Sequence, residues 1–348
     1  MRSLVDETVS DLPAPPPHLL DEARLPPATP ERHARFLNAI DAFRLVEARA
    51  PRATKAWPRR LRVAAFNAQR LKRPDAARAL LDRAAADVAL LSEVDLGMAR
   101  SGNGHPLRRM IGTADLGYLY GVEFVELDLG DPTEIRRHAG ERNERSLHGN
   151  AVVSGLALAD ACVIPLEESG FWFPGRQGAQ RRIGGRIAVA ARLAHAPKPL
   201  WIAGLHLESK TDPADRRDQV RALLRAVDRI GPRDAWILGG DFNTKELPRD
   251  PEGLRRLLDE PGRFEPLFDD LAAAGFSWAS ANLPVPTQRT GPQGRPSPPF
   301  AKLDWLVARG VVAASPQVLP ALDADGRPIS DHDMAVAEFF FDSPADRA

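Results

Sequence analysis

The chain has 348 residues, of which 43% are hydrophobic and 27% charged, a composition typical of globular proteins rather than of disordered or fibrous ones. Its 47 lysines and arginines balance its 47 aspartates and glutamates. This balance argues against a protein that binds nucleic acid or anionic lipid mainly through non-specific attraction, although it does not exclude a locally basic groove.

Cysteine use and the first residues bear on the compartment. The single cysteine, Cys162, cannot form an internal disulfide and suits a reducing environment. The residues after Met1 turn acidic where a signal peptide would become apolar, and no run approaches the ~20 apolar residues of a membrane span. We therefore expect a cytoplasmic protein without a transmembrane segment.

Residues 1–60 differ in composition from the rest of the chain. The stretch 11–30 is rich in proline, which lacks an N–H donor and fixes φ, so we expect it to be extended or irregular. From 30 to 50, apolar residues recur at helical spacing and predict one helix. These apolar positions are Phe36, Ile40, Phe43 and Val46. We expect this face to pack on the rest of the protein, with contact to a partner as the alternative.

From residue 61 onward, short apolar segments alternate with amphipathic ones, which predicts an α/β domain over 61–348 behind an N-terminal arm over 1–60. Helices are expected over 74–86 and 212–230. Strands are expected over 61–66, 88–91, 151–154, 186–193, 200–205, 235–238, 303–307 and 334–340. The proline-rich segment 276–300 is too long for a simple connection, and such loops are usually functional or disordered.

Polar residues lie at or near the ends of several of these strands, where burial alone would not place them; most follow a strand, Asp304 is embedded in one, and Asp331 and His332 precede the last. They are Asn67, Glu93, His206, Asp241, Asn243, Asp304, Asp331 and His332. Taken singly, each is compatible with a helix cap, a solvated turn or a structural histidine. So many in one chain favour a shared cleft at the strand ends, where polar groups can act together.

The residue types in this set also fit one kind of chemistry. Glu93 with Asp331, and with them Asn67 and Asp241, offers hard oxygen ligands suited to Mg²⁺ or Mn²⁺. One cysteine excludes a thiolate zinc site, and the chain has neither a phosphate-binding P-loop motif nor a Gly-x-Ser-x-Gly motif. Histidine, aspartate, asparagine and a divalent metal fit the attack of water on a phosphoester.

The sequence resembles the endonuclease/exonuclease/phosphatase superfamily, which includes deoxyribonuclease I, exonuclease III, neutral sphingomyelinases and inositol-polyphosphate 5-phosphatases. The resemblance spans about 61–341 and leaves the N-terminal arm outside. It rests on Phe66-Asn67, Leu91-Ser92-Glu93-Val94-Asp95, Gly149-Asn150-Ala151-Val152-Val153-Ser154, Leu205-His206, Gly240-Asp241-Phe242-Asn243, Leu303-Asp304-Trp305 and Ser330-Asp331-His332. Ser92 departs from the pattern, since the family commonly has Gln before the Glu.

The resemblance implies a four-layer α/β sandwich, in which two stacked mixed β-sheets are flanked by helices. It also implies that residues 61–348 form a catalytic domain that hydrolyses a phosphoester with Mg²⁺ or Mn²⁺. Glu93 would be the principal metal carboxylate, with Asn67 and Asp331 beside it.

The same resemblance assigns catalytic roles to five residues. Asp241 would orient or deprotonate the attacking water, and Asn243 would hold a phosphate oxygen. His332 would face the phosphate and be oriented by Asp304, which favours the imidazolium. His206 would be the second histidine facing the phosphate.

The sequence leaves the substrate open. Arginine-rich segments and Lys210 favour a nuclease-like phosphodiesterase, whereas the neutral total charge and only two tyrosines weaken that reading. The aromatic segment 171–175 would suit a lipid phosphodiesterase, or simply a buried strand end. Asn150, Arg100 and Lys210 are candidate substrate contacts, with Arg100 expected at the rim of the cleft. A lipid or inositol-phosphate phosphatase and an inactive binding module are the alternatives, and the intact polar set argues against the second.

Overall fold

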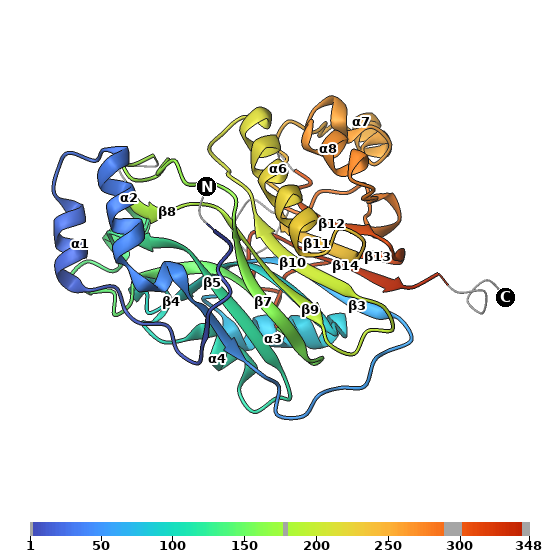
Figure 1. The fold of residues 1–348 in the computed structure, drawn as a ribbon, viewed down its shortest axis with the longest axis horizontal. Coiled ribbons are helices and arrows are strands. Elements are labelled where there is room, and N and C mark those ends of the chain that lie inside the picture. The colour runs from blue at the N-terminus through green and yellow to red at the C-terminus, as the bar shows by residue number, and fades with distance from the viewer. Residues whose placement is uncertain (1–2, 177–179, 289–300, 343–348) are drawn as a thin grey trace.

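The computed structural model describes residues 3–176, 180–288 and 301–342. Two β-sheets stack face to face, and helices cover the outer faces of both (Figure 1). Between the sheets lies a layer of buried apolar side chains that includes Val63, Leu90, Ile202 and Ile237. Within the described residues, we find no helix of sufficient length and apolar character to span a bilayer.

The larger sheet is mixed, because β1 pairs parallel with β2 and β3 parallel with β4, while its other pairs are antiparallel. Its strands, in spatial order, are β1 (Thr8–Val9), β2 (Val46–Arg49), β5 (Gly117–Glu126), β6 (Leu147–Ser154), β4 (Val88–Leu96), β3 (Leu61–Arg70), β14 (Met334–Phe340) and β13 (Val312–Leu319), with β8 (Arg182–Gly184) added along the end of β5.

The smaller sheet is also mixed, since β10 and β11 run parallel and the remaining neighbours run antiparallel. Its strands, in spatial order, are β12 (Asp304–Arg309), β11 (Ala235–Asp241), β10 (Leu200–His206), β9 (Ile187–Leu193) and β7 (Leu158–Pro165). All seven residues of β10 and of β11 are buried, as expected for central strands covered on both faces.

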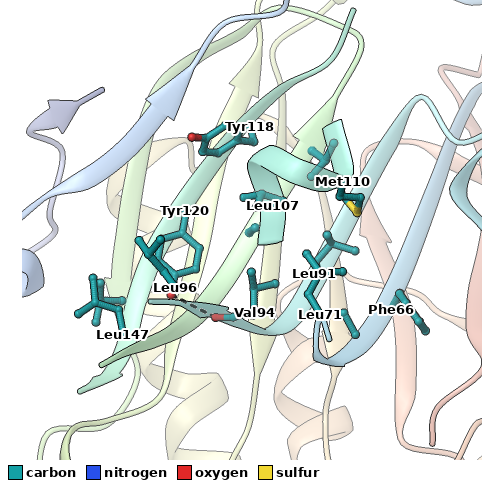
Figure 2. Close-up of a cluster of buried hydrophobic side chains, with 14 of the residues drawn as sticks. Phe66, Leu71, Leu91, Val94, Leu96, Leu107, Met110, Tyr118, Tyr120 and Leu147 are labelled. Atoms are coloured by element: carbon teal, nitrogen blue, oxygen red, sulfur yellow. Dashed lines mark hydrogen bonds between the residues drawn. The ribbon is translucent and has the colours of Figure 1, made fainter. Parts of the chain in front are cut away.

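Helices complete the outer layers. The outer face of the larger sheet packs against α2 (Pro30–Ala39), α3 (Pro74–Ala84) and α4 (Pro106–Ile111); Figure 2 shows Leu107 and Met110 of α4 against strand residues such as Leu91. On the other side lie α6 (Pro213–Ile230), α7 (Pro251–Arg256) and α8 (Leu267–Ala273) (Figure 1). The remaining helices are α1 (Pro17–Arg24) and α5 (Pro132–Arg137). The expected four-layer α/β sandwich is confirmed.

Helix α6 illustrates how the sequence sets these layers. The Asp212 side chain caps it by accepting a hydrogen bond from the Asp215 N–H, and Pro213 occupies the first turn, where its missing donor costs nothing. Val220, Leu223 and Val227 form the buried stripe that packs on the smaller sheet. The periodicity over 212–230 therefore predicted both the helix and the face that it buries.

The N-terminal segment departs from its expected structure. Residues 17–24, at the centre of the proline-rich stretch, form helix α1, because its one proline, Pro17, stands at the first helical position, where proline is well tolerated. The helix expected over 30–50 ends at Ala39, and β2 pairs with β5 in the larger sheet. The expected packing is confirmed, since the four apolar positions of this segment are all buried. A separate arm over 1–60 stays a prediction.

Candidate active site

A polar cleft of about 450 Å³ lies where the two sheets meet at one end of their strands. The larger sheet contributes Arg70, Glu93 and His148, and the smaller sheet contributes His206 and Asp241. Asn243, Asp331, His332 and Lys210 reach it from the segments that follow or precede strands. Trp172 is the only Trp, Tyr or Phe among the described residues that line it.

Three strands of the smaller sheet place His206, Asp241 and Asp304 in one row. His206 is paired with Asp241 between β10 and β11, and Asp241 is paired with Asp304 between β11 and β12. His206 Nε2 lies 3.5 Å from Asp241 Oδ2. The other carboxylate oxygen, Oδ1, accepts a 2.9 Å hydrogen bond from the Asn243 N–H, and Asn243 has a left-handed φ of 49°, which asparagine tolerates better than most residues.

His332 and Asp304 form a hydrogen-bonded pair. His332 Nδ1 lies 2.8 Å from Asp304 Oδ2, which also accepts a 2.7 Å hydrogen bond from the Thr287 hydroxyl. The His332 N–H donates to the Ser330 hydroxyl, which in turn donates to the Asn67 carbonyl. These contacts fix the ring, whose Nε2 lies 3.8 Å from Asp241 Oδ2.

The two histidines of the cleft differ in charge. Burial disfavours the imidazolium of His332, but the Asp304 and Asp241 carboxylates outweigh it and raise the pKa of His332 to about 10. Burial, followed by the positive charge of Arg186, holds the pKa of His206 well below its usual range. At neutral pH His332 is therefore a cation and His206 is neutral.

Behind His206 lies a carboxylate that the sequence analysis did not identify. Glu123 Oε2 lies 3.8 Å from His206 Nδ1, and Glu123 Oε1 accepts a 2.7 Å hydrogen bond from Arg186. Burial raises the pKa of Glu123 to about 7, with Arg186 opposing the rise. An acidic residue inside the apolar run 117–126 was the signal that could have found it, because a buried carboxylate requires a partner.

Asn67 connects the two carboxylates of the cleft floor. Its Nδ2 donates to Glu93 Oε1 at 3.1 Å and to Asp241 Oδ2 at 3.0 Å, while its Oδ1 accepts the Gln69 N–H. Burial raises the pKa of Asp241, and the positive charge of His332 opposes this rise. Glu93 has a left-handed φ of 55° beside a register shift in β4, and its second oxygen pairs with Arg70.

The donor set of the cleft fits a divalent cation. Glu93 and Asp331 bring carboxylate oxygens, the ligands that Mg²⁺ and Mn²⁺ prefer, to the same cleft. The Asn67 amide lies beside Glu93, with its Nδ2 toward that carboxylate and its Oδ1 accepting the Gln69 N–H. Asp241, Asp304 and His332 form a tighter group, with ligand atoms within 4.8 Å of one another. In that group, however, Asp304 and His332 are hydrogen-bonded to each other. Asn67, Glu93 and Asp331 are therefore the better candidates for metal ligands.

Not every expected substrate contact lies in the cleft. Lys210 lines it. The Arg100 side chain is fully buried, paired with Asp95 at 2.8 Å and with Glu134 at 3.0 Å, so the rim position expected for it is wrong. Asn150 is also buried, and its Nδ2 donates to the Ile187 carbonyl at 3.1 Å. Both side chains are held by partners within the protein.

Two of the three aromatic residues in segment 171–175 lie in the protein interior. Trp172 and Phe173 are 2% and 1% exposed, and the Trp172 indole donates to Glu208 at 2.8 Å. The burial of these two side chains favours a structural role over contact with a membrane. The part of the long loop 276–300 that the structure describes supplies Thr287, the partner of Asp304; residues 289–300 lie outside the described residues.

Comparisons with known proteins agree with this fold. The model of the Endonuclease/Exonuclease/phosphatase family matches residues 64–332, and the chain therefore belongs to this family. This family is one of metal-dependent phosphoesterases. A search among curated proteins found no match.

Solved structures show the same fold at low identity. An endonuclease/exonuclease/phosphatase from Beutenbergia cavernae is 20% identical with a TM-score of 0.57, over 82% of this chain and 72% of that one. The human Nocturnin catalytic domain with bound sulfate is 17% identical with a TM-score of 0.53, over 84% and 100%. A mannosyl-6-phosphatase from Bacteroides thetaiotaomicron is 13% identical with a TM-score of 0.53, over 81% and 100%.

Proposed function

We propose that this chain is a divalent-metal-dependent hydrolase that cleaves a phosphoester bond with an activated water. The observation that carries the proposal is the meeting of two sets of residues in one cleft. The first is the group of His206, Asp241, Asp304 and His332, and the second is the oxygen donors around Glu93. Attack of water on a phosphoester needs a base and groups that stabilise the negative charge developing on the phosphate. These two sets would supply both.

Asp241 is the proposed base. Its Oδ2 lies within 4 Å of both histidines and accepts a hydrogen bond from Asn67, and its raised pKa makes the carboxylate a stronger proton acceptor than a solvated aspartate. Asn243 would bind a phosphate oxygen, since its Nδ2 donates one N–H to the Leu207 carbonyl and has a second N–H to offer.

The histidines are proposed to act in different protonation states. The charged His332, held by Asp304, would donate to a phosphoryl oxygen and stabilise the negative charge that develops there. The neutral His206 would position the same phosphate, with the Glu123 carboxylate 3.8 Å behind its Nδ1. Asn67, Glu93 and Asp331 would hold Mg²⁺ or Mn²⁺, which when bound supplies neutralisation of phosphate charge.

Within this class we propose phosphodiester cleavage, as in a nuclease-like phosphodiesterase, with a lipid or inositol-phosphate phosphatase as the alternative. The test is the hydrolysis of bis-p-nitrophenyl phosphate and of p-nitrophenyl phosphate with Mg²⁺, with Mn²⁺ and with a chelator. We expect metal-dependent turnover of the diester, and we expect Asp241→Asn to lower kcat by about 10²–10⁴ without unfolding the protein. Turnover that survives chelation, or no turnover of either ester, would reject the proposal.

A further inference from the structure

Two lysines occupy equivalent positions beyond neighbouring parallel strands. Lys210 is the fourth residue after His206, and Lys245 is the fourth residue after Asp241, the two residues that β10 and β11 pair directly. Both lysines line the cleft. The strand register therefore brings two ammonium groups to the same wall, next to the proposed base.

These two charges differ from most other cations of the cleft. Arg70, Lys72, Arg182 and Arg186 are each paired with a carboxylate. Within the described residues neither Lys210 nor Lys245 has a carboxylate within ion-pair distance. The Lys245 Nζ instead donates to the Ser209 carbonyl at 2.9 Å. A carbonyl fixes the position of the ammonium group without neutralising its charge.

The surroundings of Lys245 also favour an anion beside it. Lys245 is half-buried; burial lowers its pKa, the charge of Lys210 lowers it further, and the Asp241 carboxylate opposes both effects. A bound anion would relieve the repulsion between two nearby ammonium groups and replace the solvent that burial has removed.

We propose that Lys210 and Lys245 form a second phosphate-binding site, which takes a non-scissile phosphate of a small phosphoester substrate. The inference rests on the proposed function, since it places the scissile phosphate at Asp241 and Asn243. A small substrate is favoured by the cleft itself. Proteins commonly bind a single strand of nucleic acid by stacking successive bases on aromatic side chains. Trp172, the only Trp, Tyr or Phe among the described lining residues, is buried and hydrogen-bonded to Glu208.

The test measures binding of two probes, inorganic phosphate and pyrophosphate, by isothermal titration of the full chain in the presence of a chelator. We expect pyrophosphate to bind at least about tenfold more tightly than phosphate, because charge-assisted contacts to a second phosphate add to those of the first. Lys210→Met and Lys245→Met should each weaken pyrophosphate binding by roughly fivefold to tenfold and change phosphate binding much less.

Arg137 provides the matched control. It lines the same cleft from α5 and has no carboxylate partner within the described residues. Arg137→Met removes the same charge, so a loss of pyrophosphate affinity equal to that of the lysine variants would indicate a diffuse positive field and overturn the proposal. The conservative variants Lys210→Arg and Lys245→Arg should retain the affinity of the wild type.

A short single-stranded oligonucleotide is the third ligand. If it bound more tightly than pyrophosphate and lost that affinity in the lysine variants, the lysines would contact a nucleic-acid backbone and the small-substrate proposal would be wrong. Equal binding of phosphate and pyrophosphate by the wild type would likewise remove the second site. Because no metal and no turnover are involved, these outcomes are independent of the test for phosphoester hydrolysis.

Discussion

The two walls of the cleft are built by different means. On the smaller sheet, His206, Asp241 and Asp304 lie in one row because β10, β11 and β12 pair in regular register. On the larger sheet, the pairing shifts register between Asn67 and Arg70 of β3 and again between Leu91 and Val94 of β4. Regular pairing aligns side chains, whereas a bulge turns one of them out of its expected direction.

The walls also differ in how their charged groups are partnered. On the smaller sheet's side, Asp304 already holds His332 through a contact of 2.8 Å between Oδ2 and Nδ1. On the larger sheet's side, Arg70 pairs with Glu93, the residue proposed as the main metal ligand. Both residues have a left-handed φ. The first arrangement is complete as it stands, whereas in the second Glu93 would exchange Arg70 for the divalent cation that we propose it binds.

Among the variants that compare the two walls, those of the His332–Asp304 pair are expected to have the largest effect. His332→Ala should lower kcat by about 10²–10³, as the loss of one preorganised donor typically does, and Asp304→Asn should cost somewhat less. The double variant should be little worse than His332→Ala, because the two groups act as one unit. Measuring kcat and the thermal midpoint of all three variants separates this from a structural role, and fully additive losses in kcat would contradict the pairing.

On the other wall, Glu93→Gln tests the metal ligand. The amide keeps the shape of the side chain and removes its charge, so the affinity for Mn²⁺ should fall by roughly tenfold or more, with the thermal midpoint in chelator nearly unchanged. Isothermal titration gives the affinity. Asp131→Asn is the control, because Asp131 lines the cleft and caps α5, a role that asparagine fulfils as well. Unchanged Mn²⁺ affinity in Glu93→Gln would remove this residue from the site.

The smallest effect is expected for Arg70→Met, which should strengthen Mn²⁺ binding, whereas Glu93→Gln should weaken it. Without the guanidinium, Glu93 loses the partner that competes with a divalent cation, so Mn²⁺ should bind about fivefold more tightly, equivalent to about 1 kcal/mol. Lys72→Met is the matched control, since Lys72 lines the same wall but pairs with Glu134 at 2.7 Å. If Arg70→Met bound Mn²⁺ no better than the wild type, Arg70 would not compete with the cation for Glu93, and the proposed difference between the two walls would be wrong.

The same contrast explains what the sequence could predict. Apolar strands that end on Asp241 or His206 reveal both the strand and the polar residue, because the pattern is local and the register is regular. Glu123 could not be placed in the cleft in this way. Its position there is evident only from its contacts with Arg186 and His206, which are distant in the chain.

Arg100 was misplaced for a related reason. The loop position is visible in the sequence, but the buried carboxylates of Asp95 and Glu134, which hold the guanidinium inside, come from separate elements. Similarly, β5 was missed because its buried acids interrupt the apolar pattern, and their partners are supplied only by the folded structure.

The row across β10, β11 and β12 limits where residues can be inserted into this chain. Successive residues of a strand face opposite sides of the sheet, so one residue inserted within β11 would turn Asp241 away from both of its neighbours. The segments that connect these strands do not share this alternation, although they carry site contacts of their own at Lys210, Asn243, Lys245 and Thr287. Single-residue insertions within the three strands should therefore abolish the row, whereas insertions in exposed parts of the connecting segments, away from these four residues, should leave it intact.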